Sequence, residues 1–172
     1  MSASLWGRGL MIAVLLNAVV GCGYHLTSSQ RLGAAQKVWV PFFSNESVSP
    51  TAQTVLRRAF YEEFHALRGL SPASSEEDAD LAMKARIISY SSRVVSYNAL
   101  DQAREYSLSL NVELEIVKKG QTTPLWKGQI QGAKQYPANR DLALQRNSEE
   151  QALDATARII AHKFISALEE SY

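Results

Sequence analysis

The 172-residue sequence has a single cysteine, Cys22, and this scarcity excludes several classes of protein. One thiol cannot form a disulfide within the chain, and it cannot supply the cysteine-rich ligand sets of structural zinc sites. An excess of one charge is also missing, because 18 Lys and Arg face 17 Asp and Glu. A protein that holds nucleic acid normally carries a clear basic excess, so the sequence argues against a nucleic-acid partner.

Catalytic motifs are absent as well. The chain has no G-x-S-x-G, S-x-x-K or H-E-x-x-H motif and no phosphate-binding G-x-x-x-x-G-K-[ST] loop. The spacing of metal ligands is not found among His25, His65 and His162. The acidic cluster of residues 71–80 lacks the glycine that would turn a loop around a bound metal ion, so we interpret the cluster as a solvated loop. The sequence therefore predicts a protein that is not an enzyme and holds no metal.

The longest apolar run, Leu10 to Val20, has about eleven residues, whereas a transmembrane helix needs roughly 20. With Arg8 before it and a small residue after it, the run predicts an export signal over residues 1–21. Val19-Val20-Gly21-Cys22 resembles the bacterial lipobox, in which the cysteine is acylated and becomes the first residue. A cysteine placed by chance after an ordinary signal remains the alternative.

We therefore expect a signal peptide in residues 1–21, a lipid anchor and short tether in residues 22–36, and one α+β domain in residues 37–172. No cofactor is expected besides the covalent lipid on Cys22. Two or three acyl chains hold a protein firmly at a membrane, whereas one binds only marginally. An Asp directly after the acylated cysteine would resemble an inner-membrane retention signal. Because this position holds Gly23, the sequence favours location of the protein in the outer membrane.

The residue pattern predicts the order β-α-β-β-β-α. A β-branched and aromatic run predicts a strand over residues 37–43, and Ser49 followed by Pro50 predicts the start of a helix that ends before Gly69. Its apolar stripe comprises Val55, Leu56, Ala59, Phe60, Phe64 and Leu67.

Three strands and a helix are expected after the polar loop. Alternating residues predict strands from Leu81 to about Tyr90, with a possible extension to Tyr97, from Arg104 to Val117, and through Trp126 to Gly132. Ser148 with Gln151 forms a capping-box pattern that predicts the start of the last helix. We expect a two-layer sandwich with two amphipathic helices on one face of a four-stranded, mostly antiparallel sheet.

Charge is distributed unevenly along this order. Residues 81–146 carry ten Lys or Arg against five Asp or Glu, whereas residues 44–80 carry three against seven and residues 147–172 two against five. The strands and their loops therefore hold the basic excess, and the exposed face and rim of the sheet could meet an anion. The alternative is that these charges only keep the outer face soluble and discourage edge-to-edge pairing.

Several motifs together resemble the lipopolysaccharide-assembly lipoprotein family LptE. They are CGYHL after the lipobox, VPFFSNES, DADL, SYN, REYSLSLNVELE, LWKG and SEEQAL, in that order along the chain. The resemblance implies a two-helix, four-strand fold and residence inside the lumen of the β-barrel LptD. It also implies that the lipoprotein plugs this barrel, supports its assembly, binds lipopolysaccharide and helps deliver it to the outer leaflet.

In the family, lipopolysaccharide binding is attributed to basic positions before the third strand and near the start of the last helix. The matching stretches of this sequence imply Arg93, Arg104, Arg140 and Arg146 as candidates, with Lys134 nearby. The main alternative is a lipoprotein that activates a cell-wall synthase, but such proteins need a long tether. Only about fifteen residues separate Cys22 from the first expected strand, which favours a barrel partner.

Overall fold

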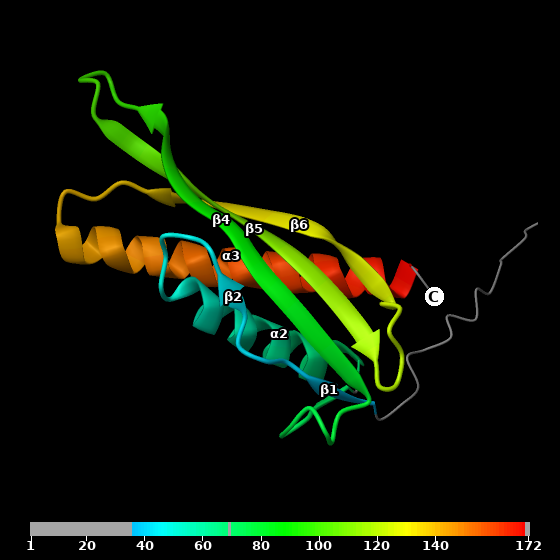
Figure 1. Cartoon of the computed structure of the whole chain (residues 1–172). Coiled ribbons are helices and arrows are strands. Elements are labelled where there is room, and N and C mark those ends of the chain that lie inside the picture. Colours follow the sequence, from blue (N-terminus) through cyan, green and yellow to red (C-terminus); the bar gives the residue numbers. More distant parts are fainter. Residues whose placement is uncertain (1–35, 69, 171–172) are drawn as a thin grey trace, which may run out of the picture.

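The structure is a computed structural model that describes residues 36–68 and 70–170, so the predicted signal peptide, Cys22 and nearly all of the tether lie outside the described part. The elements are β1 Lys37–Trp39, β2 Ser44–Asn45, α2 Ala52–Arg68, β3 Ser71–Pro72, β4 Leu81–Tyr97, β5 Ala103–Lys118, β6 Trp126–Pro137 and α3 Leu142–Glu170. Figure 1 shows two layers, with both helices on one face of the sheet. The α+β class with two helices is therefore confirmed.

Three long strands form an antiparallel meander that makes up most of the sheet. Leu81 of β4 pairs with Lys118 of β5, and Ile116 of β5 pairs with Trp126 of β6. The predicted alternation in β5 is confirmed, because Leu108, Leu110, Val112, Leu114 and Ile116 are fully buried while the residues between them remain half-exposed. β4 also runs on to Tyr97, the longer of the two expected extents.

The expectation of a four-stranded sheet is wrong, because the sheet in the described residues has six strands and mixed directions: five follow the order β3-β1-β4-β5-β6, and β2 also pairs with β4. The strand expected over residues 37–43 is interrupted: β1 and β2 both pair with β4 in parallel, and β3 pairs in parallel with β1. Pro41, which has no N–H to donate, lies in the interruption. The carbonyl of Val40 instead accepts hydrogen bonds from Arg57 Nε at 2.9 Å and the Tyr61 hydroxyl at 3.3 Å.

Both helices begin elsewhere than the sequence predicts. α2 begins at Ala52, after Ser49 and Pro50, and its first helical bond runs from Val55 N to the Thr51 carbonyl at 3.1 Å. α3 begins at Leu142, six residues before Ser148, because the Asp141 carboxylate accepts hydrogen bonds from the backbone N–H groups of Ala143 and Leu144 at 2.8 and 3.1 Å. Asp141 is therefore the N-cap, and the predicted capping box lies inside the helix.

A bulge divides β4 into two halves whose side chains alternate in opposite phase. The pairing with β5 shifts between Ile87 and Ser89, so Ile87 pairs with Val112 and Tyr90 pairs with Leu110. Odd-numbered residues before the bulge and even-numbered residues from Tyr90 to Val94 therefore face the helices, and the pairing shifts again around Ser96. The bulge turns Tyr90 and Ser92 toward α3 and Arg93 toward the opposite face.

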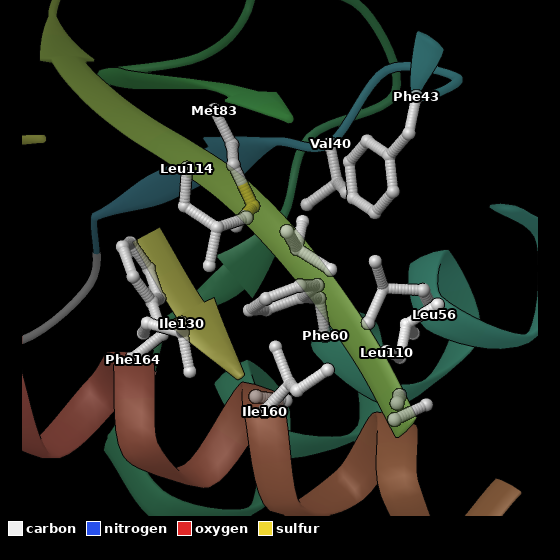
Figure 2. Close-up of a cluster of buried hydrophobic side chains, with 14 of the residues drawn as sticks. Val40, Phe43, Leu56, Phe60, Met83, Leu110, Leu114, Ile130, Ile160 and Phe164 are labelled. Atoms are coloured by element: carbon white, nitrogen blue, oxygen red, sulfur yellow. The ribbon is translucent and has the colours of Figure 1, made fainter. Parts of the chain in front are cut away.

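One hydrophobic core lies between the sheet and the helices. Phe60 of α2 and Phe164 of α3 meet edge to face at 5.6 Å between ring centroids, and Leu110, Leu114 and Ile130 cover them from the sheet (Figure 2). Phe164 also lies edge to face against Trp126 of β6 at 5.1 Å. Four residues of the predicted α2 stripe are buried, whereas Val55 is half-buried and the Leu67 side chain lies outside the description.

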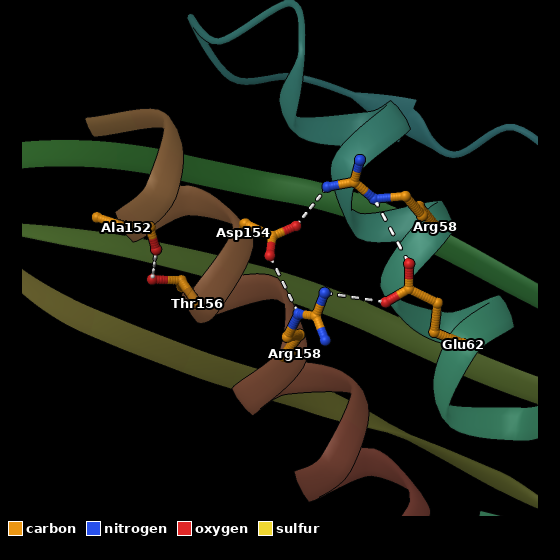
Figure 3. A network of polar contacts seen from close by, with 6 residues as sticks. All are labelled: Arg58, Glu62, Ala152, Asp154, Thr156 and Arg158. Carbon is orange, nitrogen blue, oxygen red and sulfur yellow. Dashed lines mark hydrogen bonds and ion pairs between the residues drawn. The ribbon is translucent and has the colours of Figure 1, made fainter. Parts of the chain in front are cut away.

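Ion pairs join the outer surfaces of the two helices. Asp154 of α3 accepts hydrogen bonds from Arg58 of α2 and from Arg158 Nε, the latter at 3.0 Å, and Arg158 Nη2 lies 3.1 Å from Glu62 of α2 (Figure 3). Partial burial alone would raise the pKa of Asp154, but the hydrogen bonds from Arg58 and Arg158 outweigh it and hold the pKa below its usual range. The network is largely exposed, so its contribution to stability is modest.

Candidate functional site

Most of the predicted basic site residues gather at one end of the molecule. We call this the distal end and define it as residues 93–104 of the β4–β5 hairpin together with residues 138–146, which comprise the connection from β6 to α3 and the start of α3 (Figure 1). Two bonds link its parts: Arg140 Nη2 donates to Gln102 Oε1 at 2.9 Å, and Ala138 N donates to the Arg104 carbonyl at 2.9 Å. The fold therefore brings Arg93, Arg104, Arg140 and Arg146 to the same end.

The five basic candidates are exposed, and within residues 36–68 and 70–170 none of them forms an ion pair. Lys84, Arg86 and Lys127, elsewhere on the sheet, differ because each pairs with a carboxylate. Arg86 contacts Glu113 at 2.8 Å and Glu46 at 3.0 Å, and its hydrogen bond lowers the pKa of Glu113. Positive charge in the first half of β4 is thus paired with carboxylates, whereas the arginines of the distal end form no ion pair with any described residue and can attract an anion.

The structure does not place all five candidates on one surface. Arg93 is paired with Ser107, on the face of the sheet away from the helices. Lys134 is paired with the buried Leu108, on the helix face, and lines a shallow groove with Tyr136, Ser148 and Gln151. Neighbouring paired residues of a sheet point to the same side, so the sheet separates Lys134 from Arg93.

A polar cluster under the distal end fixes the sheet to α3. The Tyr90 hydroxyl donates to the Glu149 carboxylate, and burial together with this carboxylate raises the pKa of Tyr90. The hydroxyls of Ser92 and Tyr136 are hydrogen-bonded at 2.7 Å, and the Tyr136 ring stacks on Tyr106 at 5.5 Å between centroids. Tyr90 and Tyr136 are therefore internal packing residues.

Five exposed apolar side chains lie at the distal end: Val95, Tyr97, Leu100, Leu142 and Leu144. Sequence reasoning leaves Tyr97 open as a contact residue or a core residue and misses the other four. Leu100, Leu142 and Leu144 lie outside every apolar stripe and directly beside turn residues. The sequence signal for such a contact residue is an apolar side chain that belongs to no predicted strand or helix stripe.

Other kinds of site find no support in the described part of the chain. No group of three or more His, Cys, Asp or Glu side chains in residues 36–68 and 70–170 is arranged to hold a metal ion. His65 and His162 are exposed. Among the helices that the structure describes, none combines the length and apolar character needed to cross a membrane.

The fold defines a small α+β domain, and solved structures of two bacterial lipoproteins are similar to it. A putative lipoprotein from Caulobacter crescentus CB15 is similar at a TM-score of 0.54 and 12% identity, over 74% of this chain and 88% of that one. Rare lipoprotein B from Shewanella oneidensis is similar at a TM-score of 0.54 and 15% identity, over 78% and 95%. No curated protein matches the chain.

The family model LptE, described as lipopolysaccharide-assembly, matches residues 35–168. The chain therefore belongs to the LptE family, and the resemblance seen in its sequence motifs is confirmed. The match covers every element of the structure except the last residues of α3.

Proposed function

We propose that this protein is an outer-membrane lipoprotein that complexes with and plugs an LptD-type β-barrel, assists its assembly and helps deliver lipopolysaccharide to the outer leaflet. Membership of the lipopolysaccharide-assembly family over residues 35–168 carries the proposal. Cleavage after residue 21 and acylation of Cys22 would attach the domain to the membrane through a tether of about fifteen residues. The domain then stays close to the membrane and to a partner embedded in it.

We further propose that the distal end binds lipopolysaccharide directly. The support is the set of exposed arginines that form no ion pair with any residue in the described part of the chain: Arg93, Arg104, Arg140 and Arg146. A guanidinium group presents a planar fork that donates two parallel hydrogen bonds to a phosphate, and such charge-assisted bonds are stronger than neutral ones. Lys134 would act from the helix face as a separate contact.

Depletion of the protein tests its role in assembly. The proposal predicts less surface-exposed lipopolysaccharide and less folded LptD-type barrel, and it predicts that the barrel co-purifies with the protein in roughly equal amounts. A cell-wall synthase activator would instead give wall defects with normal lipopolysaccharide export. That result, or recovery of the protein as a lone monomer after gentle detergent extraction, would contradict the proposal.

Charge removal tests the binding site. The double variant Arg140→Gln/Arg146→Gln should bind lipopolysaccharide more weakly than the wild type at moderate salt, because two exposed phosphate-binding groups are lost. Lys84→Gln/Lys127→Gln removes the same charge from exposed residues beside Glu115 and should leave binding unchanged. If the arginine double variant binds lipopolysaccharide as tightly as the wild type, this assignment is wrong.

A further inference from the structure

Exposed apolar side chains are concentrated at the distal end. The described residues include seven exposed large hydrophobic side chains, and five of them lie there: Val95 at 47%, Tyr97 at 62%, Leu100 at 75%, Leu142 at 83% and Leu144 at 56% exposure. The other two, Phe42 and Val48, lie in the segments before and after β2. Single exposed apolar residues are ordinary, whereas a group at one end suggests a contact surface.

Ordered backbone holds these side chains in the solvent. In the hairpin loop, the Asn98 side-chain oxygen accepts hydrogen bonds from Leu100 N at 2.9 Å and Gln102 N at 3.0 Å, and Asn98 N donates to the Gln102 carbonyl at 2.9 Å. Asp141 fixes the first turn of α3, which carries Leu142 and Leu144. A contact surface that is already ordered loses less conformational entropy when it binds a ligand.

Cations lie among the apolar residues. Arg140, two residues before Leu142, reaches across to Gln102, two residues after Leu100, so this arginine joins the hairpin to the start of α3. Arg104 follows the hairpin loop, and Arg146 lies one helical turn beyond Leu142. An anionic amphiphile presents phosphates and acyl chains side by side, so it can contact the arginines and the apolar side chains at the same time. Charge complementarity therefore favours an anionic lipid as the occupant.

We propose that Val95, Tyr97, Leu100, Leu142 and Leu144 form an acyl-chain contact surface. It takes the fatty-acyl part of the same lipopolysaccharide molecule whose phosphates the neighbouring arginines bind. This inference rests on the proposed function and adds a second class of contact to it. The distal end then recognises the whole amphiphile, and not its charge alone.

Comparison of intact with fully deacylated lipopolysaccharide tests the inference. The acylated, detergent-solubilised protein is titrated with each form, so that the anchor is the same in every variant. Leu100→Ser/Leu142→Ser should lower the affinity for intact lipopolysaccharide about tenfold, since two apolar contacts are lost, and leave the affinity for the deacylated form unchanged. Arg140→Gln/Arg146→Gln should lower both affinities. Phe42→Ser/Val48→Ser, which changes exposed apolar residues away from the distal end, should lower neither.

The outcomes separate this inference from the function on which it rests. Wild-type affinity of the leucine double variant for intact lipopolysaccharide overturns the acyl-chain surface alone. Equal losses for both forms also overturn it, because the leucines would then only position the arginines. Normal lipopolysaccharide binding with loss of barrel co-purification assigns the surface to the barrel instead. If the wild type binds neither form, the proposed lipopolysaccharide binding itself fails.

Discussion

At the scale of single residues, Gly132 determines how closely β6 and α3 can pack. A Cβ at this position would lie 2.8 Å from Ile160 Cγ1 and 3.0 Å from the Thr156 carbonyl oxygen. The Thr156 hydroxyl donates to the Ala152 carbonyl of the same helix at 2.8 Å, so it needs no hydrogen-bond partner from β6 (Figure 3). The close approach therefore depends on the absence of a side chain.

Gly132→Ala should lower the free energy of unfolding by about 1–3 kcal/mol, because the methyl group forces α3 away from the sheet. Chemical denaturation monitored by circular dichroism measures this change. Gln129→Ala, on the same strand with an exposed side chain, should change it by no more than about 0.5 kcal/mol. Equal stability of Gly132→Ala and the wild type would show that the helix can shift without loss.

The Asp154 network predicts a dependence of stability on pH. Hydrogen bonds from Arg58 and Arg158 hold the pKa of Asp154 below its unfolded value, so the unfolded chain takes up a proton at higher pH than the folded chain. The stabilisation is present above the ordinary Asp pKa of about 3.9 and is lost as the pH falls through the lower folded value.

In Asp154→Asn, the free energy of unfolding should therefore fall less steeply than in the wild type as the pH becomes acidic. At neutral pH the loss should be about 1 kcal/mol or less, because the network is mostly exposed. Denaturation midpoints measured between neutral and strongly acidic pH check both statements. Glu150→Gln, at an exposed site without an ion pair in the described part of the chain, should keep the wild-type profile. A profile for Asp154→Asn that parallels the wild type contradicts the account.

At the scale of elements, α3 depends on Asp141 for its start. Its carboxylate accepts two backbone N–H bonds of the first turn, whereas the Ser148 hydroxyl accepts a bond from Asn139 Nδ2 at 3.1 Å. Asp141→Ala should cost about 1 kcal/mol and fray the first turn. Ser148→Ala should cost less. Amide hydrogen exchange of residues 142–146 measures the fraying, and faster exchange in Ser148→Ala than in Asp141→Ala would reverse the assignment.

Long regular elements could be predicted from the sequence, and their interruptions could not. The two-residue alternation of β5 and the apolar stripe of α2 each repeat over many residues, so the pattern identifies them. The bulge after Ile87 changes the facing of Tyr90 and Arg93 through one added residue, which alternation cannot reveal in advance. β2 and β3 have two residues each, too few to show any period.

The same reasoning explains the result for the candidate site. The family resemblance identified basic residues by type and position, and the fold brings four of them to one end. It could not show that Lys134 lies on the helix face, because that depends on the register of β6 against β5. Nor could it show which cations lack partners, since the partners of Arg86 are 27 and 40 residues away along the chain.

At the scale of the whole molecule, both helices and the sheet share one core. Phe60 and Phe164 connect α2 and α3, and Trp126 connects α3 to β6. Phe60→Ala and Phe164→Ala should each cost about 3–5 kcal/mol, and the double variant should deviate from their sum by about 0.5–3 kcal/mol because the rings are in contact. Denaturant unfolding of all four proteins gives this coupling, and strict additivity would contradict a shared core.

The length of β4 determines how far apart its two ends would lie across a membrane. A strand of 17 residues extends over roughly 55 Å at about 3.3 Å per residue, whereas the hydrocarbon core of a bilayer is about 30 Å thick. Leu81 begins β4 beside β1, the first described strand after the predicted tether, and Tyr97 ends it at the arginine-rich hairpin. A domain enclosed in a barrel and tethered at the periplasmic leaflet would thus present its arginines at the cell surface.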